Sequence, residues 1–510
     1  MKRSIVMLLL AFVLIGITSA YASKNPTATN SINQDVQQSI SEQITQNDNG
    51  DANATIHAEG EEHSLHLDAR NLSLLWVIPF IGILLSIALF PLLLPHFWHD
   101  HYGKISLFWG LSFIIAFTIV NGPSMSLFYL LETYILEFLP FIILLLALFA
   151  VAGGIRLKGE LAGTPKINAL MIFIGALLAS WMGTTGAAML LIRPLIQANK
   201  WRKHKTHVVV FFIFLVANIG GSLTPLGDPP LFMGFLKGVD FFWTTTHLFT
   251  PFCTALAILL VLFFIVDTYY FRKETGQPIK SANGEKLSLE GKRNILIFPL
   301  IPIAVLLSSM DMGIAFTIHH VAVPFASLVQ MGLLLLITLL SVKVTPKAVR
   351  ERNEFSWEPI AEVGKLFATI FITMVPPIAM LKAGLNGPLA GIIQKLTDGN
   401  GEFINANFFW ATGILSSFLD NAPTYIIFFN TAGGDAASLM GIHAPTLVAI
   451  SIGAVFMGAN TYIGNAPNFM VRSIAEEQGV PMPTFFGYIF KYSLPILIPT
   501  FIVITFIFFW

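Results

Sequence analysis

The sequence is poor in charge and in cysteine. Asp, Glu, Lys and Arg make up 11% of its 510 residues, whereas soluble domains carry about a quarter. The formal net charge is zero, and no long Lys/Arg tract occurs outside short loops, so we expect no nucleic-acid partner. The one cysteine, Cys253, lies in an apolar run, which favours a small buried hydrophobic role. This composition excludes an ordinary soluble enzyme.

Two catalytic motifs are also missing. The chain has neither the GxxxxGK[ST] loop that holds nucleotide phosphates nor the HExxH pair of zinc hydrolases. We therefore expect no enzymatic activity and no cofactor. Without a nucleotide site, any transport must be driven by an ion gradient or by a partner.

Long apolar runs are abundant instead. The chain is 55% hydrophobic, with a mean hydropathy of +0.72, and from Leu72 onward its apolar runs reach about 17–25 residues, enough to cross a bilayer as helix. The sequence predicts an all-α polytopic membrane protein surrounded by lipid. We expect ten spans, at 72–95, 105–121, 126–152, 207–236, 249–270, 295–311, 322–342, 364–385, 446–474 and 484–508.

The N-terminus resembles a targeting segment. Lys2 and Arg3 precede an apolar core that ends in Ala20-Tyr21-Ala22, the pattern of a secretory cleavage site. We expect residues 1–22 to be a signal peptide. Residues 23–70 are rich in Asn, Gln, Ser and Glu, which predicts a disordered periplasmic tail.

Two further apolar segments, 168–198 and 404–431, are interrupted at MGTTGA and FLDNAPT. Basic residues flank the first segment on both sides, so the positive-inside rule places both of its ends in the cytoplasm. Such a segment must turn back inside the membrane, which is tolerated where protein or water surrounds the backbone. We expect a cytoplasmic-side hairpin at 168–198 and a periplasmic-side hairpin at 404–431.

The remaining loop charges predict two halves of five spans each. The first repeat is expected at 71–270, a cytoplasmic linker at 271–294 and the second repeat at 295–510. An odd number of spans makes the second repeat inverted relative to the first. We expect a multi-pass protein of the bacterial inner membrane, with its mature N-terminus in the periplasm.

The two halves also align directly. TPLGDPPLFM, which starts at Thr224, lies over TYIGNAPNFM, which starts 237 residues later at Thr461. The same offset places MGTTGA on LDNAPT, so the two hairpin interruptions coincide without a gap. The alignment and the loop charges thus predict the same pair of inverted repeats.

Four interruptions, two in hairpins and two in broken helices, are expected to converge. Half-helix ends offer N–H groups to anions and free carbonyls to cations, so such breaks form ion sites inside bilayers. The expected ion- or substrate-binding residues are Asn218, Thr224 and Asp228 in the first broken helix, Asn460, Thr461, Asn465 and Asn468 in the second, and Thr184, Thr185, Asp420 and Asn421 in the hairpins.

Asp228 and Asp420 are the strongest of these residues. An ionised carboxylate at the centre of a membrane helix costs about 2.5–3.5 kcal/mol, so it is seldom left without a partner. Two carboxylates at breaks indicate a Na⁺ site that also exchanges protons. The alternative is that each Asp only caps a half-helix by accepting backbone N–H bonds.

At these residues the sequence resembles a known family. NGPS, GTTGAAMLLIRPLI, NIGGSLTPLGDPP, FLDNAPT and IGNAPNFM are similar to signature segments of the ion transporter superfamily, in particular its NhaD-type sodium/proton antiporters and citrate transporters. The resemblance spans roughly residues 72–508 and implies that Asp228, Thr224, Asp420 and Asn421 belong to the translocation site. The chain departs from the pattern at Thr184-Thr185, where relatives often carry Asp or Asn, and at GDPP, which replaces the GD-V/T-T of typical NhaD proteins.

Two function classes remain open. A monovalent cation, Na⁺ or else Li⁺ or K⁺, is exchanged for H⁺, or a citrate-like dicarboxylate enters together with Na⁺ or H⁺. The two Asp residues favour the first class, because carboxylates repel an anionic substrate. Glu132 and Glu137 are expected to be either proton-relay groups or helix-end partners, and Lys382 either a counter-charge or a snorkelling residue. A homodimer is left open as a partner.

Overall fold

The computed structural model describes residues 67–510 apart from residues 68, 71, 160 and 277–287. The predicted signal peptide at 1–22 and nearly all of the predicted tail at 23–70 lie outside the described residues. Within them the chain is helical, and its sheet consists of two short antiparallel ladders, β1 (Arg156–Lys158) with β2 (Ser288–Glu290) and β3 (Ile314–Ile318) with β4 (Val321–Pro324). The predicted all-α polytopic membrane class is confirmed.

Six helical segments of the described residues are long and apolar enough to cross a membrane. A seventh is obtained if α15 (Glu358–Thr373) and α16 (Val375–Lys382), bent by 42°, form one span. The expected ten spans therefore include broken and shorter helices. The six segments are Leu74–Leu93, Pro95–Ala152, Pro165–Met182, Trp243–Phe271, Phe325–Val344 and Phe485–Phe508.

The longest of these segments folds back on itself at Gly122. It comprises α4 (Pro95–Glu132), the π-helix η2 (Thr133–Phe138) and α5 (Leu139–Ala152), and Gly122 interrupts α4 with a φ of 82°. The rings of Phe117 and Tyr129 lie 5.9 Å apart, although twelve residues of continuous helix would span about 18 Å. The segment therefore holds two antiparallel helices, as the predicted spans 105–121 and 126–152 require.

Two predicted spans differ from the structure. The span 295–311 consists of two short helices, α11 (Lys292–Ile297) and α12 (Leu300–Leu307), because Pro299 has no N–H to continue the helical ladder. The span 322–342 begins as strand β4, and its helix α13 (Phe325–Val344) starts after Pro324. The β-branched residues of β4 favour this extended start.

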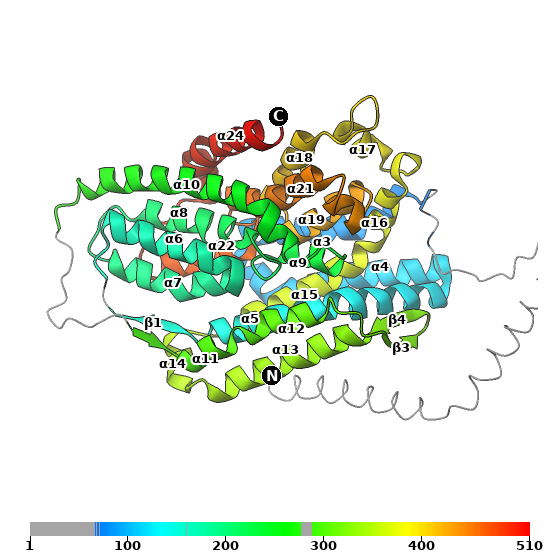
Figure 1. Ribbon diagram of the computed structural model, residues 1–510, viewed down its shortest axis with the longest axis horizontal. Coiled ribbons are helices and arrows are strands. Elements are labelled where there is room, and N and C mark those ends of the chain that lie inside the picture. The colour runs from blue at the N-terminus through cyan, green and yellow to red at the C-terminus, as the bar shows by residue number, and fades with distance from the viewer. Residues whose placement is uncertain (1–66, 68, 71, 160, 277–287) are drawn as a thin grey trace, which may run out of the picture. The chain divides into compact units, whose positions relative to one another are not determined.

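The two hairpins and the two broken helices correspond at the 237-residue offset. The first hairpin turns at Gly183, whose φ of 79° suits glycine, and its arms pack against each other (Figure 1). Helices α7 and α19 begin 237 residues apart, and so do α9 and α22. The elements are α6 (Pro165–Met182), α7 (Thr184–Ala198), α8 (Thr206–Leu215), η3 (Ile219–Ser222), α9 (Pro229–Leu236) and α10 (Trp243–Phe271) in the first repeat, and α18 (Asn405–Phe418), α19 (Asn421–Thr431), α21 (Ala444–Met457), η5 (Gly458–Asn460), α22 (Ala466–Glu477), α23 (Phe485–Tyr488), η6 (Ile489–Leu497) and α24 (Ile498–Phe508) in the second.

The two repeats exchange contacts with each other. Helix α9 packs against α19, and its counterpart α22 packs against α7. Helices α5 and α15, which lie side by side in Figure 1, contact each other through Phe141 and Phe367, whose rings are 4.9 Å apart. This arrangement brings all four interruptions of the chain together.

Loops with the predicted cytoplasmic charges meet at one end of the molecule. Glu290 pairs with both Arg156, at 3.3 Å, and Arg352, at 3.2 Å. We call this end, defined by these three residues, the basic-loop face. The opposite end of the η2–α5 segment carries Glu137, which pairs with Lys237 at the end of α9; we call it the Lys237 face. The assignment of the basic-loop face to the cytoplasmic side stays a prediction.

Candidate functional site

Asp228 lies at the centre of the converging interruptions. It precedes α9, and its side chain is 2% exposed. One carboxylate oxygen accepts hydrogen bonds from the Thr184 hydroxyl, at 3.0 Å, and from the Asn465 amide, at 3.1 Å. The other accepts from the Asn421 amide, at 2.5 Å. No side-chain bond to its own helix is made, so the capping alternative does not describe Asp228.

The donors to Asp228 stand at positions that the internal repeat relates to one another. Asn421 occupies the position in the second hairpin that Thr184 occupies in the first, and Asn465 is the counterpart of Asp228 itself, 237 residues later. One carboxylate therefore lies where two repeats meet, with donors from both. A buried carboxylate needs such bonds to offset its lost hydration.

Asp420 plays a different structural role. Its carboxylate accepts a hydrogen bond from the backbone N–H of Ala422, at 3.1 Å, and so caps α19. This is the geometry that the capping alternative predicts. Asp420 nevertheless lines the same cavity as Asp228.

A cavity of about 120 Å³ lies beside these two carboxylates. We call it the site cavity; it has about the volume of four water molecules in the liquid. Its polar lining includes Thr184, Thr185 and Asn465, and its described lining contains no Lys, Arg or His. Its apolar wall comes from α5 and α15, including Leu144, Leu148, Phe149, Ile360, Val363 and Phe367. Sequence reasoning missed this wall, because apolar residues in apolar helices carry no local signal.

Thr224 and Thr461 tie each broken helix to its hairpin. The Thr224 hydroxyl donates to the Ser180 carbonyl and accepts from the Leu226 N–H. Thr461 likewise donates to the Ser417 carbonyl, at 2.5 Å, and accepts from Ile463. The structure therefore places neither hydroxyl among the residues of the site cavity, and the sequence could not show that both are used internally.

Three predicted asparagines carry buried carbonyl oxygens. The Oδ1 atoms of Asn218, Asn421 and Asn460 have no hydrogen-bond partner among the described residues. Asn218 donates to Asn468 at 2.7 Å, joining the two broken helices, and Asn460 donates to Ser417 at 2.9 Å. Unpaired buried acceptors are costly, and a bound cation would satisfy them. Asn421 is the one that also contacts Asp228.

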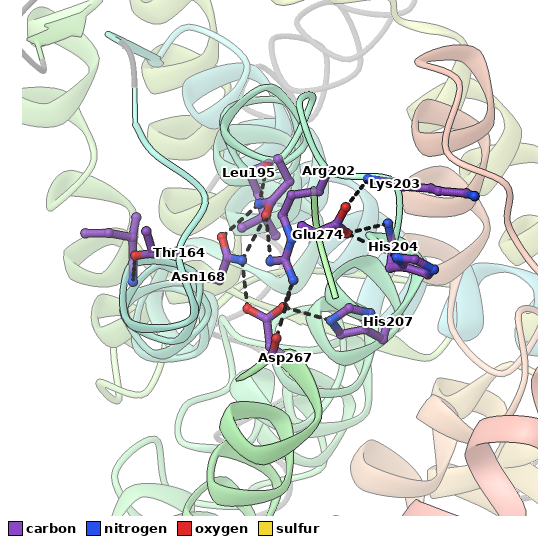
Figure 2. A network of polar contacts seen from close by, with 11 residues as sticks. Thr164, Asn168, Leu195, Arg202, Lys203, His204, His207, Asp267 and Glu274 are labelled. Carbon is purple, nitrogen blue, oxygen red and sulfur yellow. Dashed lines mark hydrogen bonds and ion pairs between the residues drawn. The ribbon is translucent and has the colours of Figure 1, made fainter. Parts of the chain in front are cut away.

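A second buried polar network lies away from the site (Figure 2). Asp267 of α10 accepts from Arg202, at 2.5 Å, from His207 of α8, at 2.8 Å, and from Asn168 of α6, at 3.0 Å. Asn168 also exchanges hydrogen bonds with Asn199 at the end of α7. The network therefore joins the first hairpin to α8 and α10. It was not predicted, although an Asp within an apolar span was a visible signal.

The comparison with protein families decides the assignment. A family model described as "Putative citrate transport" matches residues 69–509. The chain belongs to this family. The citrate transporter part of the resemblance is thus supported, whereas the NhaD-type antiporter part stays a proposal.

Similar proteins include two uncharacterized transporters and a membrane protein. An uncharacterized transporter of Mycobacterium bovis is 26% identical over 338 residues, which cover 63% of this chain and 72% of the relative. An uncharacterized transporter of Synechocystis is 23% identical over 393 residues, covering 72% and 79%. A 46 kDa membrane protein of Mycobacterium leprae is 24% identical over 398 residues, covering 73% and 86%. This chain is therefore a multi-pass membrane transporter.

Proposed function

We propose that this transporter exchanges Na⁺, or another monovalent cation such as Li⁺ or K⁺, for protons by alternating access. The observation that carries the proposal is the lining of the site cavity, where two carboxylates occur and no described Lys, Arg or His does. Such a cavity attracts cations and repels anions. Its volume of about 120 Å³ suits a small ion with a few waters.

Asp228 is the group proposed to carry both ligands. A carboxylate can bind either a proton or a hard cation through the same oxygens, so one excludes the other. The donors Thr184, Asn421 and Asn465 hold its oxygens in place. The hydroxyl of Thr185 lines the site cavity and offers a further oxygen to a cation. The Oδ1 of Asn421 is buried beside Asp228 without a hydrogen-bond partner among the described residues. Asp420 adds a second negative charge at the cavity.

The proposed location is the bacterial inner membrane, with the mature N-terminus in the periplasm and the basic-loop face in the cytoplasm. Lys/Arg-rich loops favour the cytoplasmic side. Thiol labelling of single cysteines should place the loop at 199–205 in the cytoplasm and the loop near 432–444 outside. Labelling of both from the same side contradicts the inverted arrangement. Lipid is the surrounding partner, and a homodimer is left open.

The alternative is uptake of citrate or a related dicarboxylate with Na⁺ or H⁺. The description of the matched family favours it. An anion in the site cavity would need a cation between itself and Asp228 to offset the repulsion of like charges. Thr185 is the polar group that could donate to its carboxylates, because the Asn465 amide already donates to Asp228 and to the Ala217 carbonyl.

Purified protein in proteoliposomes separates the two functions. We expect Na⁺, added against a pH gradient, to drive proton efflux with no citrate present. Li⁺ and K⁺ test the cation choice, and Asp228→Asn is the matched inactive control. Radiolabelled citrate uptake that depends on Na⁺ or H⁺, without citrate-independent exchange, would replace the antiporter proposal by the alternative.

A further inference from the structure

A second and much smaller cavity lies on the other side of the converging interruptions. Its volume is about 10 Å³, and its lining includes Met233 of α9, Ala422 and Pro423 of α19, and Phe371 of α15. We call it the small cavity. It is too small to hold more than about one water molecule.

The small cavity is the repeat-related counterpart of the site cavity. Met233 lines the former and Met470 the latter, and these residues lie 237 positions apart. The same offset relates Ala422 to Thr185 and Pro423 to Gly186, again with one residue in each cavity. Two equivalent sites in the fold thus differ more than tenfold in volume. Inverted repeats produce this asymmetry when one route to a central site is open and the other is closed.

Helices α5 and α15 show the direction of each cavity. The site cavity contacts α15 at Pro359–Phe367 and α5 at Leu144–Phe149, toward the basic-loop face. The small cavity contacts α15 at Phe367, Ile370 and Phe371, and then Met374 directly after it, on the opposite side. Phe367 lines both, and its ring packs 4.9 Å from Phe141. Phe367 therefore lies between the two cavities.

An ion pair lies farther along the closed route. Lys237 follows α9, one helical turn beyond Met233, and pairs with Glu137, one turn before Phe141. Both side chains are partly exposed, at 23% and 19%. Because Glu137 is in the π-helix η2 and Lys237 follows α9, the pair links the η2–α5 segment to the broken helix of the same repeat. π-Helical turns are frequent at functional positions.

We propose that the small cavity is the closed second route to Asp228, and that the Lys237–Glu137 ion pair keeps it closed. When the transporter changes state, this pair separates, α9 and α19 move away from α15, and Met233 becomes accessible from the Lys237 face. The site cavity closes around Met470 at the same time. The proposal rests on the alternating access of the proposed function, but on no particular ion.

Matched single cysteines test the proposal in the full-length protein. Cys253→Ser removes the one native thiol, and Met233→Cys and Met470→Cys place probes at equivalent positions in the two cavities. With a membrane-impermeant methanethiosulfonate reagent, we expect Met470→Cys to react faster than Met233→Cys in the absence of ion gradients. Adding Glu137→Gln should raise the rate at Met233→Cys and lower that at Met470→Cys by about two- to fivefold, the range expected for a partly exposed ion pair.

Two further variants make the result decisive. Glu476→Gln removes one charge from the Arg472–Glu476 pair, which lies within α22, and should leave both rates unchanged. Exchanging the charges, with Glu137→Lys and Lys237→Glu together, should restore the original ratio. Unchanged rates in Glu137→Gln, or an equal change in Glu476→Gln, would overturn the proposal. The labelling experiment measures accessibility and not transport. If the protein shows no Na⁺/H⁺ exchange but Glu137→Gln still shifts the two labelling rates, only the ion assignment is disproved.

Discussion

Helices α7 and α9 of the first repeat begin 237 residues before α19 and α22 of the second, but the charged residues of the two repeats differ. At the centre, Asp228 of the first repeat corresponds to Asn465 of the second, and Asp420 corresponds to Gly183. Away from the centre, Arg202, His207 and Asp267 form a buried network. Their counterparts at the 237-residue offset are Leu439, Ala444 and Ile504.

This difference shows that the repeat-related backbone does not require the same buried side chains in both repeats. Leu439 and Ile504 are fully buried in the second repeat, just as Arg202 and Asp267 are in the first. A buried ion pair is seldom more stable than an apolar replacement of similar volume. Its directional bonds instead fix one arrangement of hairpin, α8 and α10. Leu439 and Ile504, at the offset positions of the second repeat, make no directional side-chain bonds of this kind.

The largest expected effect comes from Asp228→Asn. The amide keeps the size of the side chain but cannot carry the charge or exchange a proton, so cation-dependent proton flux should fall to the level of empty liposomes. Asn465→Asp, which adds a carboxylate at the equivalent position, should not restore flux when combined with it, because the second carboxylate lacks the same donors. Normal flux in Asp228→Asn, with correct membrane insertion, would disprove the antiporter mechanism.

The next effect concerns the buried network. Asp267→Asn leaves Arg202 as an unpaired buried charge and should lower the free energy of unfolding by about 3–5 kcal/mol. Thermal unfolding of the detergent-solubilised protein measures this.

The control for that experiment replaces the three charged residues by the residues that stand 237 positions later in the second repeat. Arg202→Leu, His207→Ala and Asp267→Ile together remove every charge of the network and should be close to neutral. A triple variant as unstable as Asp267→Asn would show that the network contributes stability and not only orientation.

Replacing Thr224 or Thr461 by Val is expected to lower the free energy of unfolding by a smaller amount, which is the same for both. Thr224→Val and Thr461→Val each leave a buried carbonyl, of Ser180 or Ser417, without its hydroxyl donor. Each should cost about 1–3 kcal/mol, measured by the same unfolding assay. A large difference between them would show that the two hairpins are not held alike.

The smallest effect is expected for Asp420→Asn. Asn caps a helix about as well as Asp, so α19 should keep its start and unfolding should shift by less than about 0.5 kcal/mol. Cation affinity should weaken without loss of flux, because Asp228 remains. Flux as low as in Asp228→Asn would show that both carboxylates bind the transported ion.

The sequence predicted those parts of the fold that local residues determine. Gly183 and the LDN segment at Asp420 interrupt their helices visibly, so the hairpin turns and the offset of the repeats could be found. The span at 295–311 is divided into α11 and α12, and hydropathy does not show this effect of Pro299. The bond from Asn421 to Asp228 joins residues 193 positions apart, and no local pattern shows whether a carboxylate caps its own helix or meets a distant amide. The same applies to Arg202 and Asp267.

The hydrogen bonds to Asp228 also have a consequence for synthesis, because their donors are made at different times. Of its three donors, Thr184 precedes it in the chain, whereas Asn421 and Asn465 follow it by 193 and 237 residues. At about 5–20 residues per second, the ribosome reaches Asn465 roughly 10–50 s after Asp228. During that interval the nascent first half supplies one of the three donors to this carboxylate. The hydrogen bonds around Asp228 can therefore be completed only after Asn421 and Asn465 have been synthesised.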